Sequence, residues 1–160
     1  MSATKRMSTG IAAGALLISL LPATPANASC YSANHKEHAF ARKINLARAA
    51  TGENRLRLDP QLSKAAKVHT HEMVRKDLLY HTPTDALKHR VTNWMTLGEN
   101  VGVGGTVSSL HTAFMNSAPH RANILYPTFR YVGVGTLEAG GRLWVTVIFE
   151  SHADPGSPLC

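Results

Sequence analysis

Three side chains stand out as a set whose types could do chemistry: His81, Glu99 and His120. Each lies at a break beside an expected regular element, where functional groups tend to collect. Two neutral imidazoles and a carboxylate can bind a divalent ion such as zinc and leave one position open for water. Without a metal, the same trio can serve as general acid and base near neutral pH. A third interpretation stays open, in which these side chains only hydrogen-bond the backbone and hold loops in place.

The other histidines are interpreted structurally, because a chain with nine of them offers many coincidences. His69 lies on the apolar stripe of an expected helix and is assigned to the core. The segment that starts at His71 begins like the zinc-protease motif H-E-x-x-H, but Arg75 stands where the second histidine must be, which excludes that motif. Ser117 precedes His120 by three residues, yet no G-x-S-x-G elbow surrounds it, so no activated nucleophile is evident.

The elements that must position these residues are expected to be helices in the first part of the chain and strands in the last part. Periodic apolar residues predict a helix over 34–50, and Asp59 followed by Pro60 predicts the start of a second helix that ends near Leu78. Thr106 is expected to cap a third helix. The remaining expectations are a less regular connection over 84–97, a glycine-rich turn or short strand over 98–105, a short turn opened by Pro119, and a hairpin of strands over 131–137 and 143–149.

The strand over 143–149 decides the fold class, because it is apolar on both faces. Such a strand belongs in a sheet that is covered on both sides. Helices followed by a strand pair predict an α+β domain with helices packed over a central antiparallel sheet. A length of 160 residues is enough for one such domain.

The N-terminal segment has the features of a secretory signal peptide. Lys5 and Arg6 precede an 11-residue apolar run, and Ala26-Asn27-Ala28 forms an A-x-A cleavage site. We therefore expect residues 1–28 to be removed and the protein to be secreted. The apolar run is too short for a membrane helix, so no transmembrane segment is expected.

The mature chain would then carry a cysteine near each end. Cys30 and Cys160 can form one disulfide that ties the termini together, as is common in exported proteins; two free thiols are the alternative. Removing Lys5 and Arg6 lowers the formal charge from +7 to +5. A modestly basic domain attracts anionic polymers such as those of a cell wall, although the same charge can serve solubility alone.

Five segments in order form one pattern that spans about residues 38–150. They are Ile44-Asn45-x-x-Arg48 with Gly52; Leu58-Asp59-Pro60-x-Leu62-x-x-x-Ala66-x-x-His69-x-x-x-Met73; Tyr80-His81; Gly98-Glu99-Asn100; and Phe114-Met115-Asn116-Ser117-x-Pro119-His120-Arg121-x-Asn123-Ile124-Leu125 followed by Val132-Gly133-Val134-Gly135. This pattern resembles the CAP superfamily (cysteine-rich secretory proteins, antigen 5 and pathogenesis-related 1), also called the SCP domain, in its bacterial secreted form.

The resemblance implies a three-layer α-β-α sandwich formed by a single domain over residues 29–160. It also implies a cleft with two histidines and two acidic residues. His81, Glu99 and His120 match three of these four positions, but the second acid falls near Asn116 or Ser117, neither of which is acidic. Three further residues of the matching motifs, Asn100, Arg121 and Asn123, are expected to support the site. The alternatives are that Arg121 caps the third helix and that Asn123 closes a turn.

The resemblance favours a secreted binding module over an enzyme. The expected ligand is a small apolar molecule, a wall polymer or a partner protein, and the cleft can hold a divalent metal such as zinc. The alternative is an extracellular metal-assisted protease or phosphodiesterase. We expect a monomer with no specific nucleic-acid partner.

Overall fold

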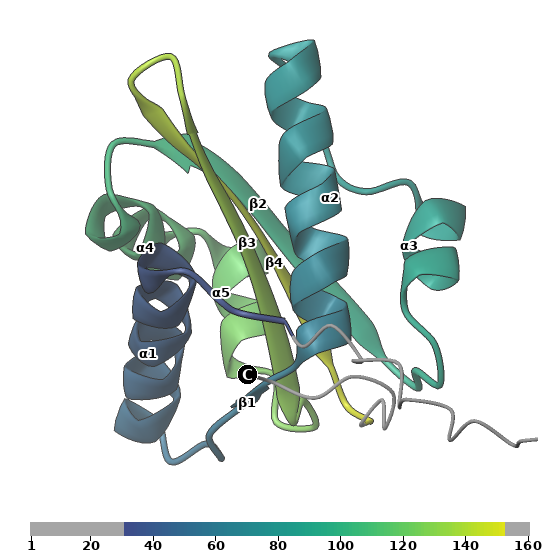
Figure 1. Ribbon diagram of the computed structural model, residues 1–160. Coiled ribbons are helices and arrows are strands. Elements are labelled where there is room, and N and C mark those ends of the chain that lie inside the picture. The colour runs from purple at the N-terminus through teal and green to yellow at the C-terminus, as the bar shows by residue number, and fades with distance from the viewer. Residues whose placement is uncertain (1–30, 153–160) are drawn as a thin grey trace, which may run out of the picture.

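The computed structural model describes residues 31–152, which form one layered domain (Figure 1). Regular elements occupy most of this range and begin with a helix, as the sequence predicts. In chain order they are α1 (His35–Ala50), β1 (Arg57–Leu58), α2 (Pro60–Lys76), α3 (Thr84–Arg90), β2 (Leu97–Gly104), α4 (Val107–Asn116), α5 (Ala118–Leu125), β3 (Tyr131–Ala139) and β4 (Arg142–Glu150).

The sheet has the strand order β1-β3-β4-β2 and lies between two layers of helices. In Figure 1, α2 and α3 lie on one side of it, and α1, α4 and α5 lie on the other. The pair β3–β4 is the expected antiparallel hairpin, and β2, expected as a turn or short strand, is an eight-residue strand that pairs antiparallel with β4. The short strand β1 pairs in parallel with β3, so the sheet is mixed. The expected α+β three-layer fold is therefore confirmed, with an additional parallel edge strand.

Strand β4 is the interior strand that its sequence predicts, and its side chains alternate between two cores. Val145 and Val147 belong to the larger core, which the sheet forms with α1, α4 and α5. Trp144 and Ile148 face α2, and Trp144 packs against Met73 of that helix. All four side chains are buried, which explains why this segment is apolar on both faces.

The predicted helix starts are confirmed at three caps. The Asn34 side chain accepts hydrogen bonds from the backbone N–H groups at the start of α1, and Glu37 completes a capping box. The Asp59 side chain caps α2, whose first residue is Pro60. Thr106 caps α4. These caps fix where α1, α2 and α4 begin.

Helix α2 lies directly on β3 because two glycines leave room for its backbone. A Cβ atom at Gly133 would lie 2.1 Å from the carbonyl carbon of Leu62, and one at Gly135 would lie 2.3 Å from the backbone nitrogen of Lys67. No side chain fits at either position unless α2 moves. The glycines of the Val-Gly-Val-Gly segment thus set the distance between the helix and the sheet.

One residue of α1 contradicts its expected place. Arg48 is expected away from the apolar side of the helix, but it follows the core residue Ile44 by four positions, which places it on that side, and its side chain is fully buried. Its Nη1 donates hydrogen bonds to the carbonyl oxygens of Ile124 (2.8 Å) and Tyr126 (3.0 Å), and its Nε donates to that of Asn54 (2.6 Å). Burial lowers the pKa of this guanidinium from its ordinary value, although the nearby Glu53 carboxylate acts in the opposite direction. Arg48 therefore joins α1 to the C-terminal end of α5.

The expected signal peptide over residues 1–28 and the expected Cys30–Cys160 disulfide both lie outside the described residues. Within 31–152, no helix has the length and apolar character needed to cross a membrane.

Candidate functional site

A cleft of about 640 Å³ lies at the edge of the sheet formed by β2. His81, Glu99 and His120 all line it, although they come from the segment after α2, from β2 and from α5. Asn100 and Asn123 line it as well. Because successive side chains of a strand point to opposite faces, Glu99 and Asn100 lie on opposite sides of β2, and the cleft extends around this edge strand.

Glu99 orients His81. The Glu99 side chain is 6% exposed, and its Oε1 lies 2.8 Å from Nδ1 of His81, whose own side chain is 60% exposed. The carboxylate oxygen is an acceptor, so Nδ1 carries the proton in this pair. In the neutral ring the lone pair is then on Nε2, which is the arrangement of a metal-binding histidine held by a carboxylate.

Thr82 also holds Glu99, and the sequence analysis missed this residue. Its backbone N–H donates to Oε1 of Glu99 (2.9 Å), and its hydroxyl donates to Oε2 (2.5 Å). The carboxylate thus accepts three hydrogen bonds from two consecutive residues. The sequence carried no local signal for these contacts, because Glu99 lies 17 positions away.

His120 lies on the other side of the cleft, in the first half of α5. Its Nδ1 lies 2.7 Å from the Ser117 hydroxyl, and its ring stacks on that of Phe114 with a centroid distance of 4.8 Å. Partial burial lowers the pKa of His120, and the charge of His81 lowers it further. Both effects favour the neutral imidazole, which is the form that binds a metal ion.

Two asparagine amides join β2 to α5. The Asn123 Nδ2 donates to the Glu99 carbonyl oxygen (3.0 Å) and to Oδ1 of Asn100 (2.9 Å). The Asn100 Nδ2 donates in turn to the His120 carbonyl oxygen (3.0 Å). Since Asn100 is fully buried, this relay fixes the backbone of His120 relative to that of Glu99.

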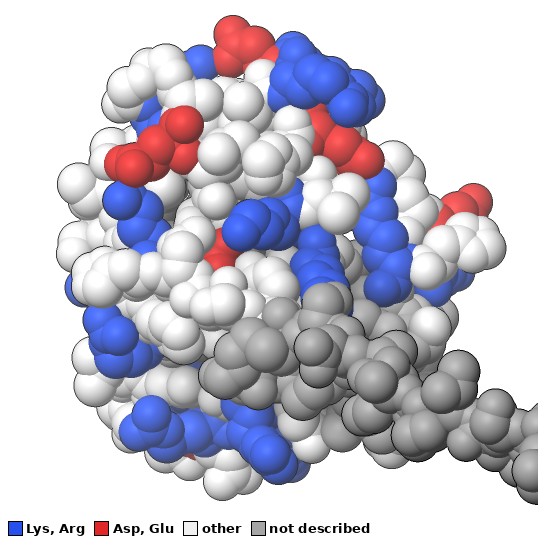
Figure 2. Space-filling view, in the orientation of Figure 1, with Lys and Arg blue, Asp and Glu red and all other residues white. Residues whose placement is uncertain are grey.

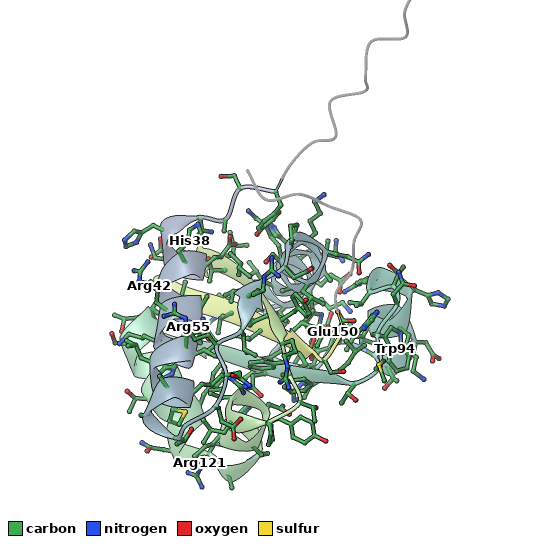
Figure 3. The ribbon with its side chains drawn as sticks, turned by 90° about the horizontal axis from the view of Figure 1, so that it is seen from below. His38, Arg42, Arg55, Trp94, Arg121 and Glu150 are labelled. Atoms are coloured by element: carbon green, nitrogen blue, oxygen red, sulfur yellow. The ribbon has the colours of Figure 1, made fainter. Side chains whose placement is uncertain are left out.

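Arg121 lies outside the cleft. In Figure 3 its side chain points away from the sheet at the outer surface of α5. Its Nη1 donates to the carbonyl oxygen of Met115 (2.8 Å), near the C-terminal end of α4. This is the helix-capping alternative considered for Arg121, and it leaves the residue with no contact to the cleft.

His69 supports the segment that carries His81. The His69 ring is buried, its Nε2 lies 2.7 Å from the Tyr80 carbonyl oxygen, and its Nδ1 lies 3.3 Å from Glu72. Burial acts to raise the pKa of Glu72, but hydrogen bonds from His69 and Arg90 outweigh it and leave the pKa below its ordinary value. Glu72 is therefore engaged in structural contacts, which agrees with the exclusion of a zinc-protease motif here.

The three predicted residues do not form a complete metal cage. Within the described range, no group of three His, Cys, Asp or Glu side chains is close enough to hold an ion among them. The Glu99 carboxylate is used by His81 and Thr82. What the cleft offers a metal is the Nε2 of His81 and the Nε2 of His120, neither of which has a hydrogen-bond partner among residues 31–152.

Comparisons with known proteins agree with this architecture. The chain is 34% identical over 124 residues to the uncharacterized protein YkwD of Bacillus subtilis (strain 168), which covers 71% of the chain and about half (48%) of that relative. The fold of the chain is similar to that of an outer surface protein from Borrelia burgdorferi, with a TM-score of 0.67, 17% identity, and coverage of 72% of this chain and 92% of that one. It is also similar to an extracellular SCP-domain protein from Bacillus anthracis, with a TM-score of 0.63, 24% identity, and coverage of 72% of this chain and 41% of that one.

A structure of NaASP2 with Zn²⁺ has the same fold, with a TM-score of 0.60 and 9% identity over 80% of this chain and 88% of that one. The family model for the cysteine-rich secretory proteins matches residues 41–149, which include every strand but the last residue of β4 and all the cleft residues. The chain belongs to this cysteine-rich secretory protein (CAP) family.

Proposed function

We propose that this chain is a secreted binding module whose cleft takes its ligand at His81 and His120, and that a divalent metal such as zinc is the group that the two imidazoles fit. One observation carries the proposal: the Glu99 carboxylate accepts a hydrogen bond from Nδ1 of His81, so it orients the imidazole. Ser117 makes the corresponding contact with His120. A metal bound here would use the two Nε2 atoms and keep its remaining positions for water or a ligand.

Two findings about relatives support this proposal. NaASP2 has been crystallised with Zn²⁺. The matching relatives and the family are named as extracellular, outer surface or secretory proteins. A wall polymer is a suitable partner for a basic exported domain, and Figure 2 shows Lys and Arg side chains distributed over the face that contains α2, with fewer Asp and Glu among them.

A hydrolase is the second candidate, because the Ser117 hydroxyl lies 2.7 Å from a ring nitrogen of His120. This is the distance expected between a nucleophile and its base. The base lacks an orienting group, however, since the Nε2 of His120 has no carboxylate partner in the described part of the chain. Turnover of casein or RNA that Ser117→Ala or His120→Ala abolishes would favour the hydrolase over the binding module.

Calorimetric titration of zinc tests the metal site. We expect wild type to bind at pH 7.5 and His81→Ala or His120→Ala to show no measurable binding, because each removes one of two ligands. Glu99→Gln is expected to bind about 10- to 100-fold more weakly, the usual effect of losing the group that orients a metal-binding histidine. Lowering the pH below about 6.5 protonates free imidazole, so binding should weaken steeply between pH 7.5 and pH 5.5.

His71→Ala is the matched control for the zinc titration, because His71 is exposed on α2 and lies outside the cleft. It should bind zinc as wild type does. Equal binding by wild type and both cleft variants, or no binding by wild type, would contradict the metal site. In that case the two histidines would have only the role of holding their segments in place.

Intact-mass measurement of the exported protein tests secretion. We expect a mature N-terminus at Ser29, because the A-x-A site ends at Ala28. We also expect no alkylation of Cys30 or Cys160 before reduction and two alkylated thiols after it. A chain that retains residues 1–28, or that is alkylated without reduction, would contradict these expectations.

A further inference from the structure

The cleft has a second wall, which the proposed metal site does not use: the segment 91–96 between α3 and β2. Trp94 and Met95 line the cleft from this segment and are 38% and 72% exposed. The other tryptophan, Trp144, is only 2% exposed in the core. In Figure 3, Trp94 lies beside α3, on the opposite side of the molecule from His38 and Arg42 of α1. A partly exposed indole in a concave site is a surface on which a ligand can stack.

The segment is held at both ends, so Trp94 is presented in a fixed place. At one end Val91 is fully buried, and Gln61 of α2 exchanges two hydrogen bonds with Thr92 (3.0 and 2.9 Å). At the other end Thr96 and Ser151 exchange two more (3.1 and 3.3 Å). Between them Asn93 adopts the left-handed conformation (φ 59°), which turns the chain just before Trp94. A platform that is ordered in advance loses little entropy when a ligand binds.

Polar residues share the cleft with the indole. The Lys88 ammonium of α3 lies over one face of the Trp94 ring, 5.9 Å from its centroid, and Thr84 and Thr96 line the same cleft. A pyranose has the matching surface, because its C–H groups form an apolar face and its hydroxyls form a polar rim. The face can pack on an aromatic ring while the rim hydrogen-bonds to the groups around it.

We propose that this cleft binds a carbohydrate chain, with one sugar ring stacked on Trp94 and its hydroxyls reaching Lys88 and the neighbouring threonines. The inference rests on the proposed function, since it names the ligand class of the same cleft. It also makes that ligand more specific, because the hydroxyls of a sugar can hydrogen-bond to the ammonium of Lys88 and to the threonines of the cleft, which an apolar molecule cannot do. Burying polar groups without partners costs free energy that a hydroxylated ligand does not incur.

Titration with soluble tetrasaccharides of N-acetylglucosamine, glucose and galacturonic acid tests this inference, with palmitate as the apolar comparison. We expect at least one sugar to bind wild type in calorimetry and to protect Trp94 from acrylamide quenching. Trp94→Ala should weaken sugar binding about tenfold, as expected for the loss of an aromatic stacking contact, and Trp94→Phe should retain part of the affinity. All three sugars should bind more weakly to Lys88→Met, because their hydroxyls reach Lys88, and galacturonate binding should fall most, because only that sugar carries a carboxylate.

Leu46→Ala serves as the matched control, since Leu46 is an exposed apolar residue of α1 outside this cleft. Its sugar affinity should equal that of wild type. The inference is overturned if no tetrasaccharide binds at millimolar concentration, if Trp94→Ala binds sugar as well as wild type, or if palmitate binds and no sugar competes. Zinc titration separates the two proposals. Trp94→Ala should bind zinc as wild type does. If wild type binds zinc but no sugar, the carbohydrate site is overturned and the proposed function stands.

Discussion

The Val147→Asp variant is expected to lose about 4 kcal/mol or more of its free energy of unfolding, enough to lower the melting temperature by roughly 15 °C. Val147 is fully buried in the interior strand β4, between Val134 of β3 and Asn100 of β2. A carboxylate at this position would be buried among the hydrophobic side chains of the larger core. Urea unfolding of both proteins at pH 7.5 measures the loss.

Val68→Asp provides the comparison for this prediction. Val68 lies on the outer face of α2 and is 48% exposed, so the same exchange leaves the new carboxylate in water. Its effect should stay within about 0.5 kcal/mol, as is usual for surface substitutions. If the two variants unfold at the same urea concentration, Val147 does not lie in an apolar core and the assignment of β4 as the interior strand is wrong.

Replacing either glycine beneath α2 should be nearly as damaging. We expect Gly133→Ala and Gly135→Ala each to cost about 3 kcal/mol, the upper end of the range for overpacking, because the new Cβ meets backbone atoms of α2. A flexible side chain could turn away from such a contact, whereas the helix backbone must move as a whole. Thermal unfolding followed by circular dichroism measures the effect.

Gly105→Ala is the control, since no atom lies within 4 Å of a Cβ at that position and its stability should barely change. A displaced α2 should also affect the site, because His69 of this helix contacts the Tyr80 carbonyl just before His81. Zinc affinity of Gly133→Ala, measured below its melting temperature, should therefore be lower than that of wild type. Wild-type stability in both glycine variants would mean that α2 does not lie this close to β3.

Much of the fold could be predicted because its signals are local. The caps at Asp59 and Thr106 lie next to the helices that they start, and the nearly continuous apolar run of β4 is visible within nine residues. Strand β1 was missed because two residues carry no periodic pattern; it exists only through its pairing with β3. Arg48 was misplaced although its spacing from Ile44 puts it on the apolar side of α1; what the sequence did not show is that two of its carbonyl partners belong to residues 76 and 78 positions away.

The candidate site shows the same difference between what local sequence signals and what only the folded structure shows. The identities of His81, Glu99 and His120 were available from the sequence, with the resemblance to a family, but their arrangement was not. The carboxylate of Glu99 meets His81 from 18 positions away, and the Asn123 amide reaches the Glu99 carbonyl from 24. Such contacts follow from how the sheet and helices pack, so which side chains orient others and which face the cleft depends on the folded structure.

The amide of Asn123 has a consequence for how the molecule behaves at high concentration. Strand β2 is at an edge of the sheet, and an exposed edge offers backbone groups to which a strand of another molecule can add, which leads to aggregation. Here the Glu99 carbonyl already accepts the Asn123 side chain, and α5 lies against the same strand. Asn123, which joins the two sides of the cleft, therefore also obstructs edge-to-edge association. An open cleft can in this way lie at the edge of a sheet without promoting aggregation through that edge.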